Sequence, residues 1–408
     1  MRIFAAVRHS KAQHSFGGSL WTRNFYPALA ELGHEVVESQ TDLDPGSRFM
    51  DVSGGFTRQE NSVREELTNR IVAELKLAHE QKPIGLFLSY FYNSHFHPDG
   101  FDEIRRMGIP SVNFYCNSIY QFELTDQIAA KVDFAWHAEK HARGSYLAVG
   151  ARPVWVQMGA DPVVYRPHEV GRSGQVCFVG RRYADRDRCA AAVIEAGIPF
   201  DLFGDGWGAT ADVSPVENDN PRHDPSYLGR PRPVPGSLLA YFHAAHREII
   251  RVGPINGSAR ILRQMQYRRK SRTLDTCLAR RARGRAPDIA ATFAQYQICL
   301  NFSNVWADGR PGSKLIPHVR LRDFEGPMSR SCFITGHTDE IEEFYKVGNE
   351  IDTYRSTDEL IDKLRFYLNH PPSAERLREA GYCRARRDHT WVRRFQQLFG
   401  EIGLTMKI

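Results

Sequence analysis

The chain reads Val176-Cys-Phe-Val-Gly-Arg-Arg-Tyr-Ala-Asp-Arg186 near its middle, and this segment sets the expected architecture. A short apolar run, Val176–Val179, leads through a glycine turn into a helix-like stretch, Asp185–Ala196. Such a strand–turn–helix unit is typical of a parallel sheet that helices cover on both faces. The second half continues with apolar runs at Phe200–Phe203, Ile298–Phe302 and Phe333–Thr335, and it closes with helical patterns at Thr357–Asn369, Ala374–Arg386 and Trp391–Gly400.

The first half of the chain shows the same alternation of strands and helices. The expected strands are Arg2–Val7, Glu35–Glu38, Ile84–Tyr90, Ser111–Tyr115, Phe134–His137 and Pro153–Val156. The expected helices between them are Leu20–Leu32, Asn61–Glu80, Phe101–Met107, Gln121–Ala130 and Ala138–Val149. We therefore predict an α/β protein with two Rossmann-like parallel-sheet domains that face a cleft, because ligands of such sheets bind beyond the carboxyl ends of the strands.

The length of 408 residues fits two domains of about 100–200 residues each. A linker rich in Pro and Gly surrounds residue 165, so we expect an N-terminal domain at 1–162 and a C-terminal domain at 163–390. The last segment, 391–408, is expected to be a helix that crosses back to the first domain.

Composition excludes several classes of protein. With 42% hydrophobic and 25% charged residues, the chain is neither collagen-like nor mostly disordered. It contains no run of about 18 apolar residues that would predict a transmembrane helix. Seven scattered cysteines without a C-x-x-C pair argue against a disulfide scaffold and favour a reducing cytoplasm, with a peripheral position at the inner face of the membrane as a further option.

A basic segment interrupts the second half, and we place this insertion at about 247–287. Ser258–Arg285 holds ten basic residues and one acid, a net charge of +9, so the rest of the chain, with a total of +6, sums to −3 and the basicity is local. The segment is expected to project from the surface, either as a solvated face or as a site for an anionic acceptor, acidic lipid headgroups or nucleic acid. Nucleic acid is disfavoured because Tyr267 is the only aromatic residue in the run. The candidates for membrane contact are Arg260, Arg263, Arg268, Arg269 and Lys270.

Two turns that follow expected strands are candidate binding sites. Gly17 and Gly18 open the first helix of the chain, where unpaired N–H groups can donate hydrogen bonds to an anion or a sugar, although the pair can also serve as a simple turn. In the second half, Gly180 is followed by three arginines that can clamp a diphosphate, namely Arg181, Arg182 and Arg186. The alternative is a solvated helix start in which these arginines pair with nearby aspartates. Glycines and an aromatic residue follow the next strand and are expected at the edge of the cleft: Gly204, Gly206 and Trp207.

A third candidate site precedes the strand Phe333–Thr335. Glu325 is expected on a helix, where its carboxylate can accept both hydroxyls of a ribose or a sugar. Arg320 and Arg322 flank it and can neutralise a leaving phosphate. The alternative for Glu325 is a helix-surface residue that pairs with an arginine.

The order of these motifs resembles that of GT-B glycosyltransferases, most closely the branch with a group-1 C-terminal domain found in spore-maturation-type proteins. The matching residues include Phe16-Gly-Gly18, Gly159-Ala-Asp161, Phe178-Val-Gly180, Phe203-Gly-Asp-Gly-Trp207 and Arg322-Asp-Phe-Glu325. The resemblance covers most of the chain and is most specific over residues 298–390. It implies a nucleotide-diphosphate-sugar donor held by the second domain and an acceptor of unknown identity held by the first. Glu325 then corresponds to the ribose- or sugar-binding glutamate, and Gly180 with the arginines after it corresponds to the phosphate-side loop.

The resemblance leaves the stereochemical outcome open. Related retaining enzymes carry a second acid eight residues before the glutamate, and this position is Pro317 here. For an inverting reaction the base is expected from the first domain, where His14 is the candidate and His9, His95 and His97 are alternatives. Arginines and helix N-termini can replace a metal in this chemistry, so we expect neither a metal nor another cofactor.

We therefore predict a glycosyltransferase that is independent of metal. One alternative is a sugar-nucleotide epimerase-type enzyme on the same fold. The other is a module that binds nucleic acid or membrane through the basic insertion.

Overall fold

The computed structural model describes residues 1–11, 20–208, 245, 249 and 253–404, and these fall into two compact units. The first unit contains Met1–Gln157 and the segment from Trp391 onward, and the second contains the described residues between Met158 and Thr390. Three candidate residues, His14, Gly17 and Gly18, lie outside the described residues.

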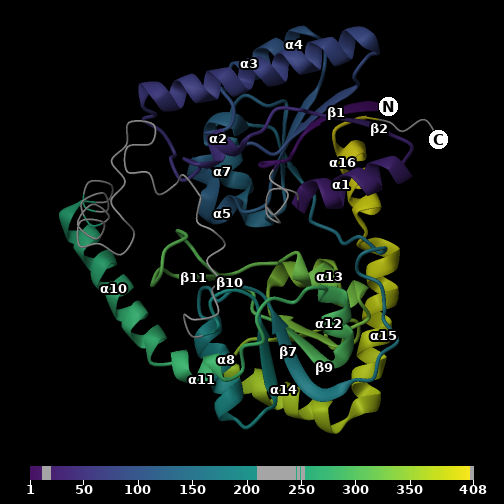
Figure 1. Cartoon of the computed structure of the whole chain (residues 1–408). Helices are drawn as coiled ribbons and strands as arrows, with labels where there is room; N and C mark the ends of the chain where they lie inside the picture. Colours follow the sequence, from purple (N-terminus) through teal and green to yellow (C-terminus); the bar gives the residue numbers. More distant parts are fainter. Residues whose placement is uncertain (12–19, 209–244, 246–248, 250–252, 405–408) are drawn as a thin grey trace. The chain divides into compact units, whose positions relative to one another are not determined.

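The first unit is built on a six-stranded parallel sheet with the order β2-β1-β3-β4-β5-β6. Figure 1 labels β1 and β2, the first two neighbours of this order. Ile3 of β1 stands in register with Val36 of β2 on one side and with Leu86 of β3 on the other. The six expected strands are all present, because each apolar run is buried between helices. Their bounds are β1 Arg2–Ala6, β2 Glu35–Glu38, β3 Leu86–Ser89, β4 Ser111–Tyr115, β5 Phe134–His137 and β6 Pro153–Trp155.

The helices of the first unit agree with the sequence prediction for the longer segments and differ for the shorter ones. The expected helix Gln121–Ala130 is wrong, because α5, η2 and α6 replace it. The buried Asn93 side chain explains the break, since its amide donates to the Glu123 carbonyl and its oxygen accepts from the Gln127 N–H. The expected helix Ala138–Val149 likewise begins late, as η3 and α7. The bounds are α1 Leu20–Glu31, α2 Asp44–Ser47, α3 Arg58–Gln81, α4 Gly100–Arg106, α5 Ser118–Gln121, η2 Phe122–Leu124, α6 Asp126–Ala129, η3 Lys140–Ala142, α7 Arg143–Ala148 and α16 Trp391–Glu401.

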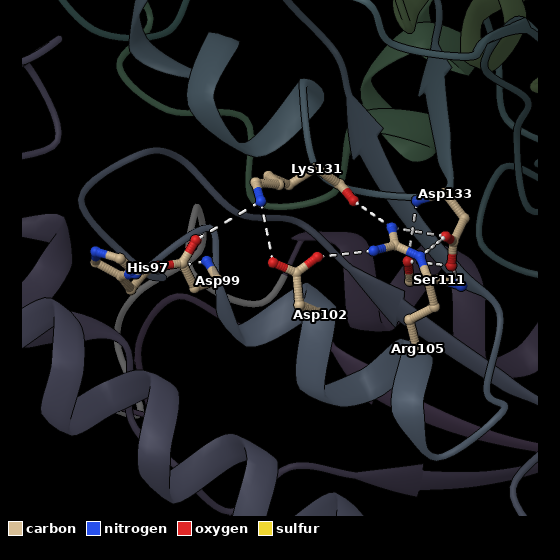
Figure 2. Close-up of polar contacts among 7 residues, drawn as sticks. All are labelled: His97, Asp99, Asp102, Arg105, Ser111, Lys131 and Asp133. Carbon is tan, nitrogen blue, oxygen red and sulfur yellow. Dashed lines mark hydrogen bonds and ion pairs between the residues drawn. The ribbon is translucent and has the colours of Figure 1, made fainter.

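A polar network fastens α4 to the amino ends of β4 and β5, as Figure 2 shows. Asp133 accepts hydrogen bonds from the N–H and hydroxyl groups of Ser111 and from the Arg105 guanidinium. Asp102 bridges the same Arg105 to Lys131. These contacts lie at the amino ends of the strands, whereas ligands of parallel sheets bind at the carboxyl ends. The network therefore stabilises the packing of α4 on the sheet and lies away from the ligand-binding edge.

Helix α16 completes the core of the first unit by packing on α1. The ring of Phe25 lies 5.1 Å from that of Trp391 and 5.3 Å from that of Phe395, all measured between centroids. The indole N–H of Trp391 donates to the Asn24 side-chain oxygen at 2.8 Å, and both residues are buried. The C-terminal helix therefore belongs structurally to the first unit.

We expect Trp391→Phe to lower the free energy of unfolding by about 1–3 kcal/mol, because it leaves the buried acceptor of Asn24 without its donor. Urea unfolding followed by circular dichroism measures this change. Gln397→Ala, on the exposed face of the same helix, is the matched control and should change stability by less than about 0.5 kcal/mol. Equal stability of the two variants would contradict this role for α16.

The second unit is built on a five-stranded parallel sheet with the order β13-β12-β9-β7-β8. The expected strands are present, whereas β13 and the antiparallel hairpin β10–β11 are additions. The strands are β7 Ser173–Val179, β8 Phe200–Phe203, β9 Tyr296–Asn301, β10 Asn304–Trp306, β11 Leu315–Pro317, β12 Phe333–Gly336 and β13 Asp352–Tyr354. The helices are α8 Arg186–Glu195, α10 Pro254–Arg272, α11 Asp275–Ala279, α12 Ile289–Gln295, α13 Arg322–Met328, η6 Asp339–Glu343, α14 Thr357–Asn369 and α15 Pro371–Asp388.

The basic segment was expected to project from the surface because of its charge. It instead forms α10 and α11, which pack in part on the second unit. After α11 the chain runs along β8, where Leu202 exchanges backbone hydrogen bonds with Arg281 and Arg283. The hydroxyl of Tyr267 donates to the Ala184 carbonyl. The side of α10 that carries Tyr267 is therefore packed on the second unit, and the opposite side is exposed.

Candidate functional site

Polar side chains of the second unit gather where β7, β9 and β12 end. These three strands are neighbours in the parallel sheet, so the segments that follow them share one edge. Asn301 ends β9 and Thr335 lies near the end of β12, while α8 and α13 begin close to the same edge. This is the edge at which parallel α/β sheets bind ligands.

Asp323 ties the elements at this edge together. Its carboxylate accepts hydrogen bonds from Asn301 Nδ2 at 2.8 Å, Thr335 Oγ1 at 2.7 Å and the Arg320 backbone N–H at 2.6 Å. Burial raises the pKa of Asp323, and these hydrogen bonds act in the opposite direction. The contacts fix the backbone of Arg320 relative to the ends of two strands.

Arg186, the first residue of α8, is a buried cation whose described contacts include no carboxylate within ion-pair distance. Its guanidinium donates to the carbonyls of Arg181 and Phe302 at 2.8 Å and 3.3 Å. Its Nε is buried and makes no hydrogen bond to the described residues. Burial, and then the charge of Arg320, lower the pKa of Arg186 to about 9. At neutral pH the group therefore still carries its charge, in a place where that charge is costly.

Arg320 supplies the second cation of this site. Its Nε and Nη2 atoms are buried, and neither finds a hydrogen-bond partner among the described residues. Two neighbouring guanidinium groups repel each other and lose hydration, so a site of this kind gains when an anion enters. The three unpartnered nitrogen atoms, Nε of Arg186 with Nε and Nη2 of Arg320, provide donors for its oxygens.

Glu325 lies on α13 and is only 1% exposed, so it is not a helix-surface residue. One carboxylate oxygen, Oε2, pairs with Arg322, as the alternative prediction held, but the other, Oε1, is buried without a partner among the described residues. Arg322 also makes a side-chain hydrogen bond with Tyr165, and burial lowers the pKa of Arg322. Glu325 thus keeps one free acceptor oxygen, whereas Arg322 has its charge balanced.

Gly204, Gly206 and Trp207 support the loop at Gly180 from beneath. The Trp207 indole is 1% exposed and donates to the Gly180 carbonyl at 2.7 Å. A Cβ atom on Gly204 would lie 2.5 Å from the same carbonyl oxygen, and one on Gly206 would lie 3.2 Å from the Cβ of Arg182. These residues act by placing Gly180, and the buried ring of Trp207 offers no surface to a ligand.

The first two arginines after Gly180, Arg181 and Arg182, have different surroundings. Arg182 donates to Asp275 at 2.7 Å and to the Ser271 carbonyl at 2.7 Å, and it lies 3.5 Å from Asp187. It therefore fastens α10 and α11 to α8, which is close to the alternative of an ion-paired helix start. Arg181 is exposed.

The histidines of the first unit have structural surroundings. His95 is fully buried, accepts from the Tyr92 N–H and bonds Ser47 through Nε2 at 2.9 Å, and burial lowers its pKa. His9 stacks on Tyr90 at 4.5 Å, and burial lowers the pKa of His9 to about 4. His97 faces Asp99 in the surface network of Figure 2.

Sequence reasoning missed Asp323, Asn301 and Thr335 as parts of the site. A signal was available for two of them, because a polar residue at the end of an apolar strand is expected at the ligand-binding edge. Asp323 stands in the helix that carries Glu325, but its side-chain partners, Asn301 and Thr335, are more than ten residues away in the sequence.

Residues 240–400 match a family model described as glycosyl transferase-like. No curated protein matches the chain. The solved structures with a similar fold include HepE from Anabaena in complex with UDP and glucose, at 10% identity and a TM-score of 0.52, with 99% of this chain and 100% of that chain covered. Sucrose-phosphate synthase from Thermosynechococcus elongatus is 14% identical at a TM-score of 0.55, with 99% of each chain covered. A glycosyltransferase from Rickettsia africae is 10% identical at the same TM-score, with 100% and 99% covered.

Fold and family match together define the class of protein. The predicted resemblance is confirmed at this level: residues 240–400 are glycosyl transferase-like, and the chain is built from two Rossmann-like parallel sheets with the GT-B fold of the solved glycosyltransferases that it resembles. The family match includes the basic segment, so α10 and α11 lie inside the glycosyl transferase-like region.

Among the residues that the structure describes, no group of three or more His, Cys, Asp or Glu side chains is placed to hold a metal ion. None of the helices in this part of the chain combines the length and the apolar character needed to span a bilayer.

Proposed function

We propose that this protein transfers a sugar from a nucleotide-diphosphate-sugar donor to a hydroxyl group of an acceptor, and that Arg186 and Arg320 bind the diphosphate. The observation that carries the proposal is this pair of buried guanidinium groups with unpartnered N–H groups at the carboxyl edge of the second sheet. HepE, which has a similar fold, has been solved with UDP, and this supports a nucleotide donor.

The chemistry follows from where negative charge develops. When the bond between the anomeric carbon and the diphosphate oxygen breaks, the electron pair stays on the diphosphate. Arg186 and Arg320 stabilise that charge, which is the role that a metal ion has in other transferases, so the reaction proceeds without metal. The acceptor oxygen forms the new bond and releases its proton to a base, for which His14 of the first unit is the sequence candidate.

Glu325 is the group that distinguishes a nucleotide from a bare diphosphate. Its Oε1 atom is a buried acceptor without a partner among the described residues, which suits a ribose hydroxyl. The Arg322 contact at Oε2 orients the carboxylate.

Isothermal titration of the full chain tests the proposal with pyrophosphate and with a panel of UDP-, GDP-, TDP- and ADP-sugars. We expect pyrophosphate and at least one nucleotide sugar to bind in the presence of EDTA and to compete with each other. Absence of binding by every member of the panel would contradict the proposal. Product analysis without an acceptor separates the epimerase alternative, because an epimerase would convert the sugar of the donor by itself.

A further inference from the structure

Helix α10 carries aliphatic side chains along its exposed side. Ile255 is 84% exposed, Leu262 is 59% exposed and Met265 is 62% exposed. Leu262 follows Ile255 by about two helical turns and Met265 comes about one turn later, so the three residues lie on one side of the helix. Ala259, which is also exposed, lies between them. Single exposed aliphatic residues are common, whereas a continuous row of them indicates an interaction surface. We call this row the aliphatic stripe.

The opposite side of α10 fixes the orientation of the helix. The hydroxyl of Tyr267 donates to the Ala184 carbonyl, and its ring centroid lies 5.0 Å from that of Trp306. The hydroxyl of Ser271 donates to the Asp187 carboxylate at 2.6 Å. Because these contacts hold the inner side of α10 on the second unit, the aliphatic stripe stays on the outer side.

Cationic side chains border the aliphatic stripe. At about 100° of rotation per residue, Arg263 and Lys270 lie about 80–100° to one side of Leu262. Arg272 lies about 80° to the other side, and Arg269 continues the line of the stripe toward the end of the helix. All four cations are exposed, and among the described residues none of them has a carboxylate within ion-pair distance. The outer side of α10 is therefore both aliphatic and positively charged.

This combination indicates a partner that is both apolar and anionic. Helix α10 contains no Asp or Glu, so a second copy of the same helix would bring like charges together. Single-stranded nucleic acid is anionic, but its bases stack on aromatic side chains, and Tyr267 is turned toward the second unit. The surface of a bilayer with acidic lipids offers both requirements, because hydrocarbon lies directly beneath anionic headgroups.

We infer that α10 binds the surface of a membrane that contains acidic lipids and lies parallel to the bilayer, with the aliphatic stripe inserted between the headgroups. The bordering cations then reach the lipid phosphates. Of the cations predicted for membrane contact, Arg263, Arg269 and Lys270 fit this surface, whereas Arg260 is half-buried and lies 3.7 Å from Asp308. The inference does not depend on the proposed function, since none of these residues belongs to the diphosphate site.

Flotation of the full chain with lipid vesicles tests the inference. We expect the chain to bind vesicles of phosphatidylcholine mixed with phosphatidylglycerol, and not vesicles of phosphatidylcholine alone. Leu262→Gln should weaken this binding about tenfold or more, because it removes an inserted aliphatic side chain and leaves every charge in place. The matched control is Leu77→Gln on α3, where the leucine is 60% exposed. It should bind within about twofold of the wild type.

A second pair of variants tests the cations. Lys270→Gln should weaken binding to the acidic vesicles about fivefold, because a cation near an anionic membrane surface is attracted to it. Its control, Arg376→Gln, removes a charge from an exposed position on α15 and should leave binding unchanged. Circular dichroism establishes that each variant is folded. Arg320→Gln should bind vesicles like the wild type, so the membrane surface and the diphosphate site can fail independently.

Three results would overturn the inference. The first is a wild-type chain that does not bind the acidic vesicles, and the second is Leu262→Gln protein that binds them as the wild type does. The third is a loss of binding in Leu77→Gln as large as that in Leu262→Gln. A chain that ignores vesicles but forms a dimer that Leu262→Gln dissociates would replace the membrane by a second copy of the chain as the partner of the aliphatic stripe.

Discussion

Arg320→Gln is expected to weaken pyrophosphate binding by about a hundredfold or more. Arg320 contributes two unpartnered nitrogen atoms, Nε and Nη2, and a hydrogen bond between charged groups contributes about 1.5–3 kcal/mol. The same substitution should raise the melting temperature of the ligand-free protein, because it removes a like charge beside the buried Arg186. Isothermal titration measures the first effect and thermal unfolding the second.

The matched control for this substitution is Arg188→Gln, an exposed position on α8. It removes the same charge from the same unit and should leave pyrophosphate affinity within about twofold. Opposite signs for stability and affinity at Arg320 are the signature of a binding site, since a structural arginine would lower both when it is removed. An Arg320→Gln protein that binds pyrophosphate like the wild type would rule out the proposed role.

Glu325→Gln is expected to separate nucleotide binding from diphosphate binding. The amide oxygen is a weaker acceptor for ribose hydroxyls than the carboxylate, so the affinity for the nucleoside diphosphate of the donor should fall about 10- to 100-fold. Pyrophosphate carries no ribose, and its affinity should change by less than about threefold. Titration of the variant with UDP, GDP, TDP and ADP beside pyrophosphate checks both expectations.

Glu379→Gln, an exposed position on α15, is the control for the loss of one carboxylate from the second unit. It should leave all of these affinities unchanged. An equal loss of nucleotide and pyrophosphate binding in Glu325→Gln would mean that the carboxylate acts by placing Arg322 and not by contacting ribose.

The sheets were predictable because their strands are short apolar runs with helical patterns between them. Each such run, from Arg2–Ala6 to Phe333–Gly336, is buried by the helices that flank it in the sequence, so local pattern and final structure agree. The hairpin β10–β11 and the strand Asp352–Tyr354 are only three residues long per strand, too short for periodicity to reveal. The break in the expected helix Gln121–Ala130 depends on Asn93, a residue from a distant loop, and no local pattern encodes it.

For the candidate site, the sequence indicates which residue types lie near the sheet edge, but it does not indicate which partner each side chain contacts. Arg182 and Arg186 are equivalent in the sequence, yet Arg182 is paired with Asp275, which lies 93 positions further on. Arg186 is turned into the protein instead, where it meets Arg320. Which arginine stays available for a ligand is a consequence of tertiary packing. Trp207 shows the same limit, since a glycine-rich loop with an aromatic residue predicts a contact with a nucleotide, and the ring lies buried beneath Gly180.

A crystal structure of the full chain soaked with UDP tests the diphosphate site most directly. We predict that diphosphate oxygens lie about 2.7–3.1 Å from Arg186 Nε and from Arg320 Nε or Nη2, with a ribose hydroxyl at Glu325 Oε1. A diphosphate that binds elsewhere in a fully occupied crystal, for example between α10 and the hairpin turn, while those nitrogen atoms stay without a partner, would contradict it.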